Sequence, residues 1–411
     1  MMTPSEISLP SVGPVATDDR IRYLDLLRGF AVMAIFIVNI KAMVMPFAFY
    51  MNASLWPSQT DQLIAVVQKY LVDDKWRTTF TALYGAGLMM MWDRISTRGG
   101  TRGVLFRRTA WLTFFGAVHL FGLWTGDILF LYGVTGFLAI LFVRMRARTL
   151  AVVGLIVLLL GTLWLCAFSA GPVFDPALRA ELKPIFWAPS VEQIADEVAR
   201  QNGPIWPRLS NRVLEGLDYL LFYVVLGGFL PVTLGLMLLG MALYRTGLLK
   251  GSWPIRRTLP LAIALLAGAW ALDGLQISQL KTSDYDFDVY SLNQWMASID
   301  GYLGSLGFCC LISVLASLGV KFKAVQAVGR MAFTNYIACT LIGTTLGVGH
   351  GAGLYGEASL TTLMFIVVAT FAAMLLWSVL WLRQFRFGPL EWLWRSLVYG
   401  GFQPMRRQRQ A

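Results

Sequence analysis

Long apolar runs alternate with polar, charge-rich segments along almost the whole chain. A helix needs roughly 20 mostly apolar residues to cross a hydrocarbon core about 30 Å thick. Runs of that kind predict about ten transmembrane helices. The predicted helices occupy residues 28–48, 78–93, 106–124, 127–143, 149–169, 219–244, 259–277, 301–320, 331–349 and 361–382.

The same pattern excludes the other broad fold classes. A transmembrane β-barrel would show short segments of alternating apolar and polar residues, and runs such as residues 151–168 show no such alternation. Only 14% of the residues are charged and 57% are hydrophobic, whereas soluble domains carry about 25% charged residues. We therefore predict an all-α fold, a polytopic integral membrane helical bundle.

Basic residues concentrate in alternate polar segments, and this distribution predicts the orientation of the chain. With the N-terminus inside, the inner segments hold 24 of the 34 Lys and Arg residues but only six of the 23 Asp and Glu residues. Both termini are therefore predicted to be cytoplasmic. A basic face against anionic lipid headgroups explains the net charge of +11, so no nucleic-acid partner is expected.

The polar segments divide the chain into three predicted parts. Residues 1–24 form a cytoplasmic N-terminal tail without the apolar core of a cleavable signal. Residues 25–385 form the transmembrane domain, and residues 386–411 form a basic cytoplasmic tail. Three outer segments are longer than simple turns and predict either a lid that binds an acceptor or plain connectors on the membrane. They are residues 51–77, 170–216 and 278–300.

The cysteines and a glycine-rich motif do not predict a function. All four cysteines lie in apolar runs, so the sequence predicts no disulfide framework and no metal site. Residues 351–356 match the G-x-G-x-x-G pattern, but they lie in a short outer loop between two membrane helices. A nucleotide fingerprint needs a strand before it and a helix after it, so this match carries no weight.

Ionisable side chains at membrane depth are costly and therefore suggest function. Of the two histidines, His119 lies inside a predicted membrane helix, whereas His350 ends another and is predicted to be a loop residue. Asp127 opens the next helix, and a tight hairpin would bring it beside His119. The pair predicts a general base oriented by a carboxylate. A purely structural hydrogen bond that closes the hairpin is an equal alternative.

Two predicted helices carry polar residues with the same spacing. Arg108 precedes His119 by eleven residues, and Arg28 precedes Asn39 by eleven. Eleven residues make almost three turns, so each pair lies on one helix face, separated by roughly 16–17 Å. Arg28, Arg107 and Arg108 could hold the phosphates of an elongated donor such as coenzyme A. The alternative is that these arginines only follow the inside-positive rule.

The sequence resembles a known family over residues 20–402. The phrases RIRYLDLLRGFAVMAIFIVNI, GRMAFTNYI, HLFGLWTGDILFLYG and FRFGPLEWLWRSLVYG are similar to the bacterial YeiB-like membrane proteins. The first phrase is shared more widely. It also resembles the opening helix of heparan-α-glucosaminide N-acetyltransferase and of acyltransferase type 3 proteins, and Asn39 stands where the latter have a histidine.

This resemblance implies a membrane acyltransferase with Arg28 in the donor-binding motif. Such relatives move an acyl group from cytoplasmic coenzyme A thioester to an acceptor across the membrane, and some dimerise. The resemblance also implies the bacterial inner membrane as the location. One departure is clear: the glucosaminide enzyme has its catalytic histidine after the first helix, and residues 40–76 contain none here.

We therefore expect a multi-pass acyltransferase that uses acyl-CoA, with acetyl-CoA the expected donor and a sugar, lipid or metabolite as acceptor. His119 and Asp127 would be catalytic. Asn39, Asn335 or Tyr336 would steady the thioester oxygen. A transporter of a small metabolite or lipid is the main alternative, since buried polar groups suit it as well. A sensor or scaffold is the third.

Overall fold

The computed structural model describes residues 22–349 and 351–407, and they form an all-α bundle. No named strand occurs among these residues, which confirms the predicted fold class. The main helices of the bundle are α1 (Arg22–Val44), α4 (Lys75–Thr97), α5 (Gly103–Val118), α6 (Leu129–Ala139), α7 (Ala147–Phe174), α11 (Phe229–Arg245), α12 (Ile255–Thr282), α14 (Gln294–Ser317), α16 (Ala332–Gly347) and α17 (Leu360–Gln384).

The other helices connect these elements or cover the ends of the bundle. They are α2 (Phe47–Met51), α3 (Gln59–Leu71), α8 (Pro176–Phe186), α9 (Val191–Asn202), α10 (Ile205–Asp218), α13 (Phe287–Leu292), α15 (Lys323–Arg330) and α18 (Pro389–Tyr399). Wider π-helical turns follow α5 at His119–Leu123 and α10 at Tyr219–Leu226. Each of the ten predicted runs overlaps a different one of the ten main helices, and the run 219–244 also covers the π-helical turn before α11.

Fewer than ten of these helices qualify as membrane spans by length and composition. Among the described residues, α1, α7, α12, α14 and α17 qualify alone, and a bent pair formed by α10 and α11 adds a sixth. The other predicted spans are shorter or more polar. In α4, for example, Thr78, Thr79 and Thr81 are buried against neighbouring helices. The structure therefore establishes a helical membrane bundle, and the count of about ten crossings remains a prediction.

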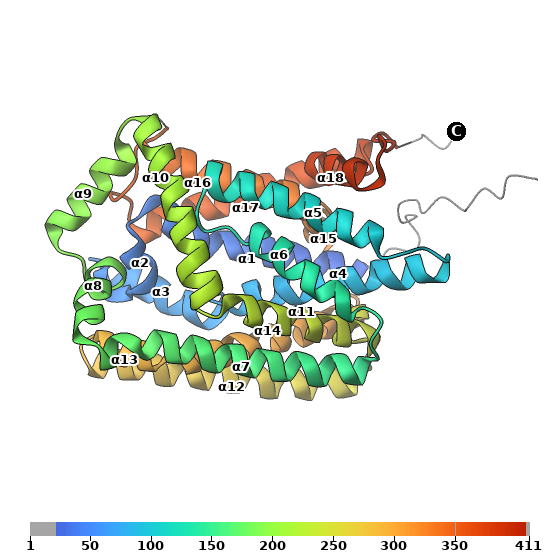
Figure 1. Cartoon of the computed structure of the whole chain (residues 1–411), viewed down its shortest axis with the longest axis horizontal. Helices are drawn as coiled ribbons and strands as arrows, with labels where there is room; N and C mark the ends of the chain where they lie inside the picture. The colour runs from blue at the N-terminus through green and yellow to red at the C-terminus, as the bar shows by residue number, and fades with distance from the viewer. Residues whose placement is uncertain (1–21, 350, 408–411) are drawn as a thin grey trace, which may run out of the picture.

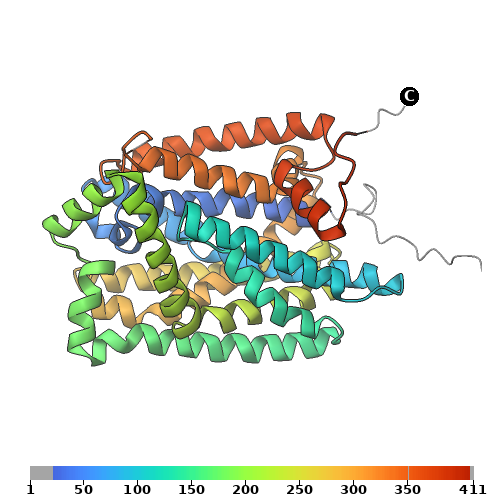
Figure 2. The same cartoon turned by 45° about the horizontal axis from the view of Figure 1, so that its top comes forward.

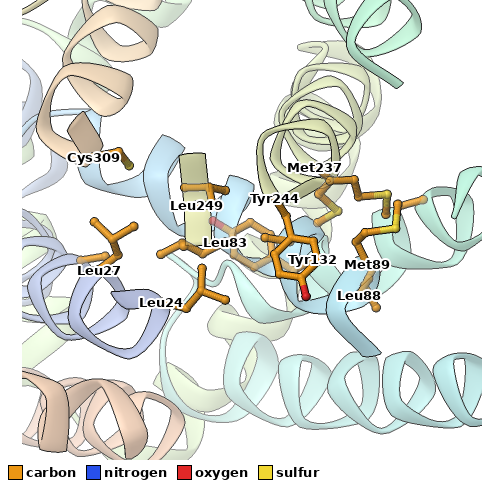
Figure 3. Close-up of a cluster of buried hydrophobic side chains, with 14 of the residues drawn as sticks. Leu24, Leu27, Leu83, Leu88, Met89, Tyr132, Met237, Tyr244, Leu249 and Cys309 are labelled. Carbon is orange, nitrogen blue, oxygen red and sulfur yellow. The ribbon is translucent and has the colours of Figure 1, made fainter. Parts of the chain in front are cut away.

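The helices are arranged around α1. Figures 1 and 2 show α1 and α4 between one group formed by α7, α12 and α14 and another formed by α16 and α17. Helix α1 packs against α4, α15 and α16, and α11 joins α4 to α7. The core between α1, α4 and α11 is apolar, with Leu27, Leu83 and Met237 completely buried (Figure 3). Helices α1 and α16 are therefore direct neighbours in the bundle.

The outward face of the bundle is apolar. Large aliphatic and aromatic side chains are exposed along α7 and α17, and so many exposed apolar side chains on two helices are unusual for a soluble monomer. Examples are Leu160, Leu163, Phe365, Val368 and Leu376. Because helices satisfy their own backbone hydrogen bonds, such a surface is stable against lipid chains. The chain is therefore a multi-pass membrane protein.

The three predicted outer segments meet at Trp187, which is almost completely buried. The Asn52 amide donates a hydrogen bond to the Trp187 carbonyl (3.0 Å), and the Trp187 indole donates to the Tyr285 carbonyl (2.6 Å). The Trp187 ring stacks on Tyr290 with 4.1 Å between centroids. Helices α8 and α9 thus belong to a cap at one end of the bundle, opposite α18 (Figure 1).

A break separates α10 from α11. The two helices meet at an angle of 65°, and Gly228 at the junction has a φ of 79°. This left-handed conformation favours glycine because a Cβ atom would clash with the backbone. The π-helical turn at Tyr219–Leu226 widens the helix just before the bend. The chain therefore changes direction at a position that the apolar run 219–244 did not reveal.

The start of α1 and the C-terminal helix lie at the same end of the bundle. Gly329, near the end of α15, packs against the backbone of Asp25 in α1. Glu391 of α18 contacts the start of α16, which follows α15 directly. Residues 25 and 391 therefore face the same side, as the predicted location of both termini requires. Most of the predicted N-terminal tail, residues 1–21, lies outside the described residues.

Glu391 caps α16, whose own N-terminal residue Met331 makes no side-chain cap. The Glu391 carboxylate accepts hydrogen bonds from the backbone N–H groups of Phe333 (2.7 Å) and Thr334 (3.1 Å) and from the Thr334 hydroxyl (2.6 Å). Burial raises the pKa of Glu391, and the Thr334 hydrogen bonds oppose that rise. A negative group at this position also interacts favourably with the helix dipole.

We expect Glu391→Ala to lower the free energy of unfolding by about 1.5–3 kcal/mol, the usual contribution of hydrogen bonds to a charged group. Glu391→Gln is the matched control, because its amide oxygen can still accept one of the bonds. Thermal unfolding in detergent measures both variants. A Glu391→Ala midpoint equal to that of the wild type would show that the cap is not needed.

Candidate functional site

His119 begins the π-helical turn that ends α5, and its side chain is 1% exposed. Such a turn inserts an extra residue into the helix and re-aims the side chains around it, and it is frequent at functional sites. Arg108 and His119 both lie on the buried side of α5, together with Leu112 and Gly116. The helix therefore carries a basic group and an imidazole on one face at two depths, as the spacing predicted.

The predicted pairing of His119 with Asp127 is present. The Nδ1 atom of His119 lies 2.7 Å from the Oδ2 atom of Asp127, and both side chains are buried. The other carboxylate oxygen of Asp127 accepts a hydrogen bond from the backbone N–H of Phe130 at the start of α6 (2.5 Å). The hairpin is tight because Gly116 lets α5 approach the backbone of Phe130, where a Cβ atom would clash.

Helix α16 supplies the remaining groups around the imidazole. The Thr340 hydroxyl lies 3.0 Å from the Nε2 atom of His119, and the ring of Tyr336 lies 5.2 Å from the imidazole between centroids. The hydroxyl of Tyr336 is also close to Asp127 and to the backbone of Ile128. Both nitrogens of the buried imidazole therefore have a polar neighbour, and the carboxylate favours the tautomer with its proton on Nδ1.

Asn39 lies on the α1 side of the same region and is half-buried. Together with Tyr336 and Thr340 it lines a narrow gap between α1 and α16, which is otherwise apolar. The gap is too narrow to hold a water molecule, so a bound acyl group requires these two helices to separate. The structure thus brings four predicted residues into one region: His119, Asp127, Asn39 and Tyr336.

Arg28 and Arg108 form a second cluster near the first residues of α1 and α5, at the end of the bundle that carries α18. The guanidinium of Arg108 lies 3.9 Å above the ring of Trp394 in α18, and the Trp394 indole donates to the Arg108 carbonyl. Arg28 contacts Asp25 at 3.2 Å and is close enough to Arg108 to repel it. The buried Nε atom of Arg108 makes no hydrogen bond within the described part of the chain. Two neighbouring cations with an open donor suit an anionic ligand.

The structure does not bring two other predicted residues into these clusters. Arg107 is exposed on the same face of α5 as Phe114 and Val118, away from the buried side that carries Arg108. Asn335 is buried on another face of α16, where its amide donates to the Val328 carbonyl and to Ser378. These contacts fit a packing role better than contact with a ligand. His350 lies outside the described residues.

Sequence reasoning missed a buried cluster of four charged residues. Lys75 lies 3.1 Å from Asp273 and 3.2 Å from Asp300, and all three side chains are completely buried. Lys69 lies 2.8 Å from Asp300 and 3.5 Å from Asp273. The cluster joins α3 and α4 to α12 and α14. Asp273, a charge inside the apolar run 259–277, was the signal that could have revealed it.

Comparison with known proteins shows the family. Residues 243–401 match the family described as a protein of unknown function, DUF418. The chain is 31% identical to uncharacterized protein YeiB of Escherichia coli (strain K12), over 91% of this chain and 95% of that protein. It is 29% identical to uncharacterized protein YxaH of Bacillus subtilis (strain 168), over 98% and 100% of the two chains. The chain belongs to the YeiB family.

The similarity within the YeiB family covers both halves of the candidate site. The DUF418 match at residues 243–401 includes Tyr336, Thr340 and Trp394, but it excludes His119 and Asp127. The similarity to YeiB and YxaH extends over nearly the whole chain. The DUF418 portion therefore contributes one wall of the site, and the N-terminal helices contribute the imidazole, the carboxylate and Arg28.

Proposed function

We propose that this YeiB family protein is an acyltransferase of the bacterial inner membrane. It would move an acyl group, with acetyl the expected one, from cytoplasmic acyl-CoA to a hydroxyl or amine at the extracytoplasmic side. The observation that carries the proposal is the buried His119–Asp127 pair, with 2.7 Å between Nδ1 and Oδ2. A base oriented by a carboxylate and shielded from water is the usual requirement for activating an acceptor.

The cluster of Arg28 and Arg108, here called the cation cluster, supports acyl-CoA as the donor. Arg28 and Arg108 lie at the inner end of α1 and α5, roughly 16–17 Å along the helices from Asn39 and His119. The phosphates of a coenzyme would contact Arg28 and the open Nε donor of Arg108, and its extended arm would run outward along α1. Arginine suits this contact because its guanidinium forms paired hydrogen bonds with phosphate oxygens.

The polar groups around His119 support the proposed acyl transfer. With its proton on Nδ1 beside Asp127, His119 presents the lone pair of Nε2 to the Thr340 hydroxyl at the wall of the gap between α1 and α16. Once the gap opens, this nitrogen can remove a proton from the acceptor. Asn39 and Tyr336 line the same region. Either polar group could stabilise the oxyanion that forms as the thioester is attacked. The acceptor would approach from the cap built around Trp187.

A direct test uses purified protein and acetyl-CoA labelled in the acetyl group. The wild type should bind the thioester and release or transfer the label, and His119→Ala should lose the release but keep the binding. Thermal unfolding of both proteins controls for misfolding. The proposal fails if the folded wild type neither binds acetyl-CoA nor turns it over in a way that depends on His119.

We expect Arg108→Gln to raise the KM for acetyl-CoA roughly 10–100-fold with kcat almost unchanged, since a charged hydrogen bond contributes about 1.5–3 kcal/mol. When a substitution weakens the binding of substrate and of transition state equally, KM rises and kcat stays the same. Arg107→Gln is the matched comparison, because it removes the same charge from the exposed face of α5. Equal KM values for the two variants would contradict the assignment of the donor phosphates to the buried face.

Transport of a small metabolite or lipid is the second candidate, and one observation favours it. The break between α10 and α11, with its 65° bend, resembles the discontinuous helices of transporters. Proteoliposomes loaded with the protein can be incubated with a bacterial metabolite extract and their contents analysed by mass spectrometry. Accumulation of a compound of unchanged mass, independent of His119, would favour transport over acyl transfer.

A further inference from the structure

The Thr340 hydroxyl completes a chain of three side chains within the candidate site. Asp127 lies 2.7 Å from one nitrogen of His119, and the Thr340 hydroxyl lies 3.0 Å from the other. The order is carboxylate, imidazole and hydroxyl. This is the arrangement in which a base activates a nucleophile and a third group orients the base.

The contacts of the imidazole define the direction of proton transfer along these three side chains. With the Asp127 carboxylate at Nδ1, the tautomer protonated at Nδ1 is favoured, and Nε2 is then an acceptor. The Thr340 hydroxyl can therefore donate to Nε2 at 3.0 Å, and its alternative acceptor, the Tyr336 carbonyl, is farther away at 3.3 Å. A hydroxyl that donates to an imidazole lone pair can lose its proton as it attacks a carbonyl carbon.

The position of Thr340 also differs from that of its helical neighbour. Thr340 lines the gap between α1 and α16 that Asn39 reaches from the other side. One turn later, within the described part of the chain, the Thr344 hydroxyl has only backbone carbonyls as hydrogen-bond partners, at Thr340 and Leu341. Both threonines make the ordinary bond to the preceding turn of the helix. Only Thr340 adds an imidazole and a place at the wall of the gap.

We propose that Thr340 is the nucleophile of the transfer and carries the acyl group as an ester between two half-reactions. This inference rests on the proposed acyltransferase function. In the first half-reaction the Thr340 oxygen attacks the thioester carbonyl and its proton passes to Nε2 of His119. The carbon–sulfur bond breaks, and the coenzyme A thiolate takes the proton and leaves as free thiol.

The second half-reaction returns the enzyme to its starting state. The acceptor hydroxyl or amine gives its proton to Nε2 and attacks the ester carbonyl of acyl-Thr340. The bond between the carbonyl carbon and the Thr340 oxygen breaks, and the proton on Nε2 returns to that oxygen. Neither step requires an oxidant, a reductant or a further reactant. The acceptor need not be present when coenzyme A leaves.

Coenzyme A exchange tests the first half-reaction without knowledge of the acceptor. Purified full-length protein is incubated with unlabelled acetyl-CoA and radiolabelled coenzyme A, and label in acetyl-CoA is measured over time. The wild type should catalyse the exchange, Thr340→Ser should retain it, and Thr340→Val should lose it. Thr344→Val should match the wild type. Acid-quenched wild type should carry one acetyl group on the peptide with Thr340, released by hydroxylamine.

Failure of the Thr340 intermediate and failure of the acyltransferase function give different results. If the wild type turns over acetyl-CoA in a His119-dependent manner and Thr340→Val still exchanges coenzyme A, the Thr340 intermediate is overturned and the acyltransferase function stands. If the wild type shows neither turnover nor exchange that depends on His119, the function itself fails and the inference with it. Thermal unfolding of Thr340→Val and Thr340→Ser separates loss of exchange from loss of the fold.

Discussion

Asp127→Asn should lower the rate of acyl transfer roughly 10²–10⁴-fold, the range that correctly oriented acid–base catalysis contributes. The amide would remove the negative charge 2.7 Å from Nδ1 of His119. It could then donate to Nδ1 and shift the proton to Nε2, which would no longer accept a proton from the nucleophile or the acceptor. The affinity for acetyl-CoA should change little, because the cation cluster is unaltered.

The Asn variant is chosen because it keeps the fold of the hairpin. Its carbonyl oxygen can still accept the hydrogen bond from the backbone of Phe130, whereas Asp127→Ala would lose that contact as well. Steady-state kinetics with acetyl-CoA and thermal unfolding give the rate, the KM and the stability. An Asp127→Asn variant as active as the wild type would leave the pair with only a structural role.

Lys75→Met should be strongly destabilising, by about 3–5 kcal/mol, because it leaves buried carboxylates without one of their cations. Lys75 is completely buried, contacts both Asp273 and Asp300, and packs its aliphatic stem against Gly304 of α14. Methionine preserves much of the apolar stem and removes the charge. The remaining Lys69 would then face two carboxylates alone. We expect a lower unfolding midpoint in detergent and less folded protein in the membrane.

The double variant Lys75→Met with Asp273→Asn separates charge from packing. It removes one charge of each sign, so the pair of Lys69 and Asp300, 2.8 Å apart, stays balanced. Buried ion pairs can often be replaced by neutral groups at little cost. The double variant should therefore recover much of the stability. A double variant as unstable as Lys75→Met alone would show that packing, not uncompensated charge, causes the loss.

The fold and part of the site were predictable because they depend on local patterns. Long apolar runs specify helices, and the short link between His119 and Asp127 limits how far these residues can lie apart. Eleven-residue spacings place Arg108 and His119 on one helix face wherever the helix packs. These predictions required only helix geometry and a tight hairpin, which Gly116 permits.

The remaining features depend on tertiary packing, which the sequence pattern does not contain. Thr340 lies 221 positions from its partner His119 along the chain, and nothing local distinguishes it from Thr344. The contacts of Lys75 with Asp273 and Asp300 likewise join distant helices. Arg107 and Arg108 are neighbours in sequence, yet only the packing of α18 shows which one is buried. The π-helical turn at His119 and the bend at Gly228 left no clear signal.

The central claim is that acyl-CoA binds between the cation cluster and His119, and the location of the bound donor tests it most directly. A cryo-electron microscopy map of the full-length protein with a non-hydrolysable acetyl-CoA analogue would show it. We predict density from Arg28 and Arg108 at the inner end of α1 and α5, extending between α1 and α16 to His119, with these two helices moved apart. Lipid in that space with the analogue absent, or the analogue bound elsewhere, would contradict the claim.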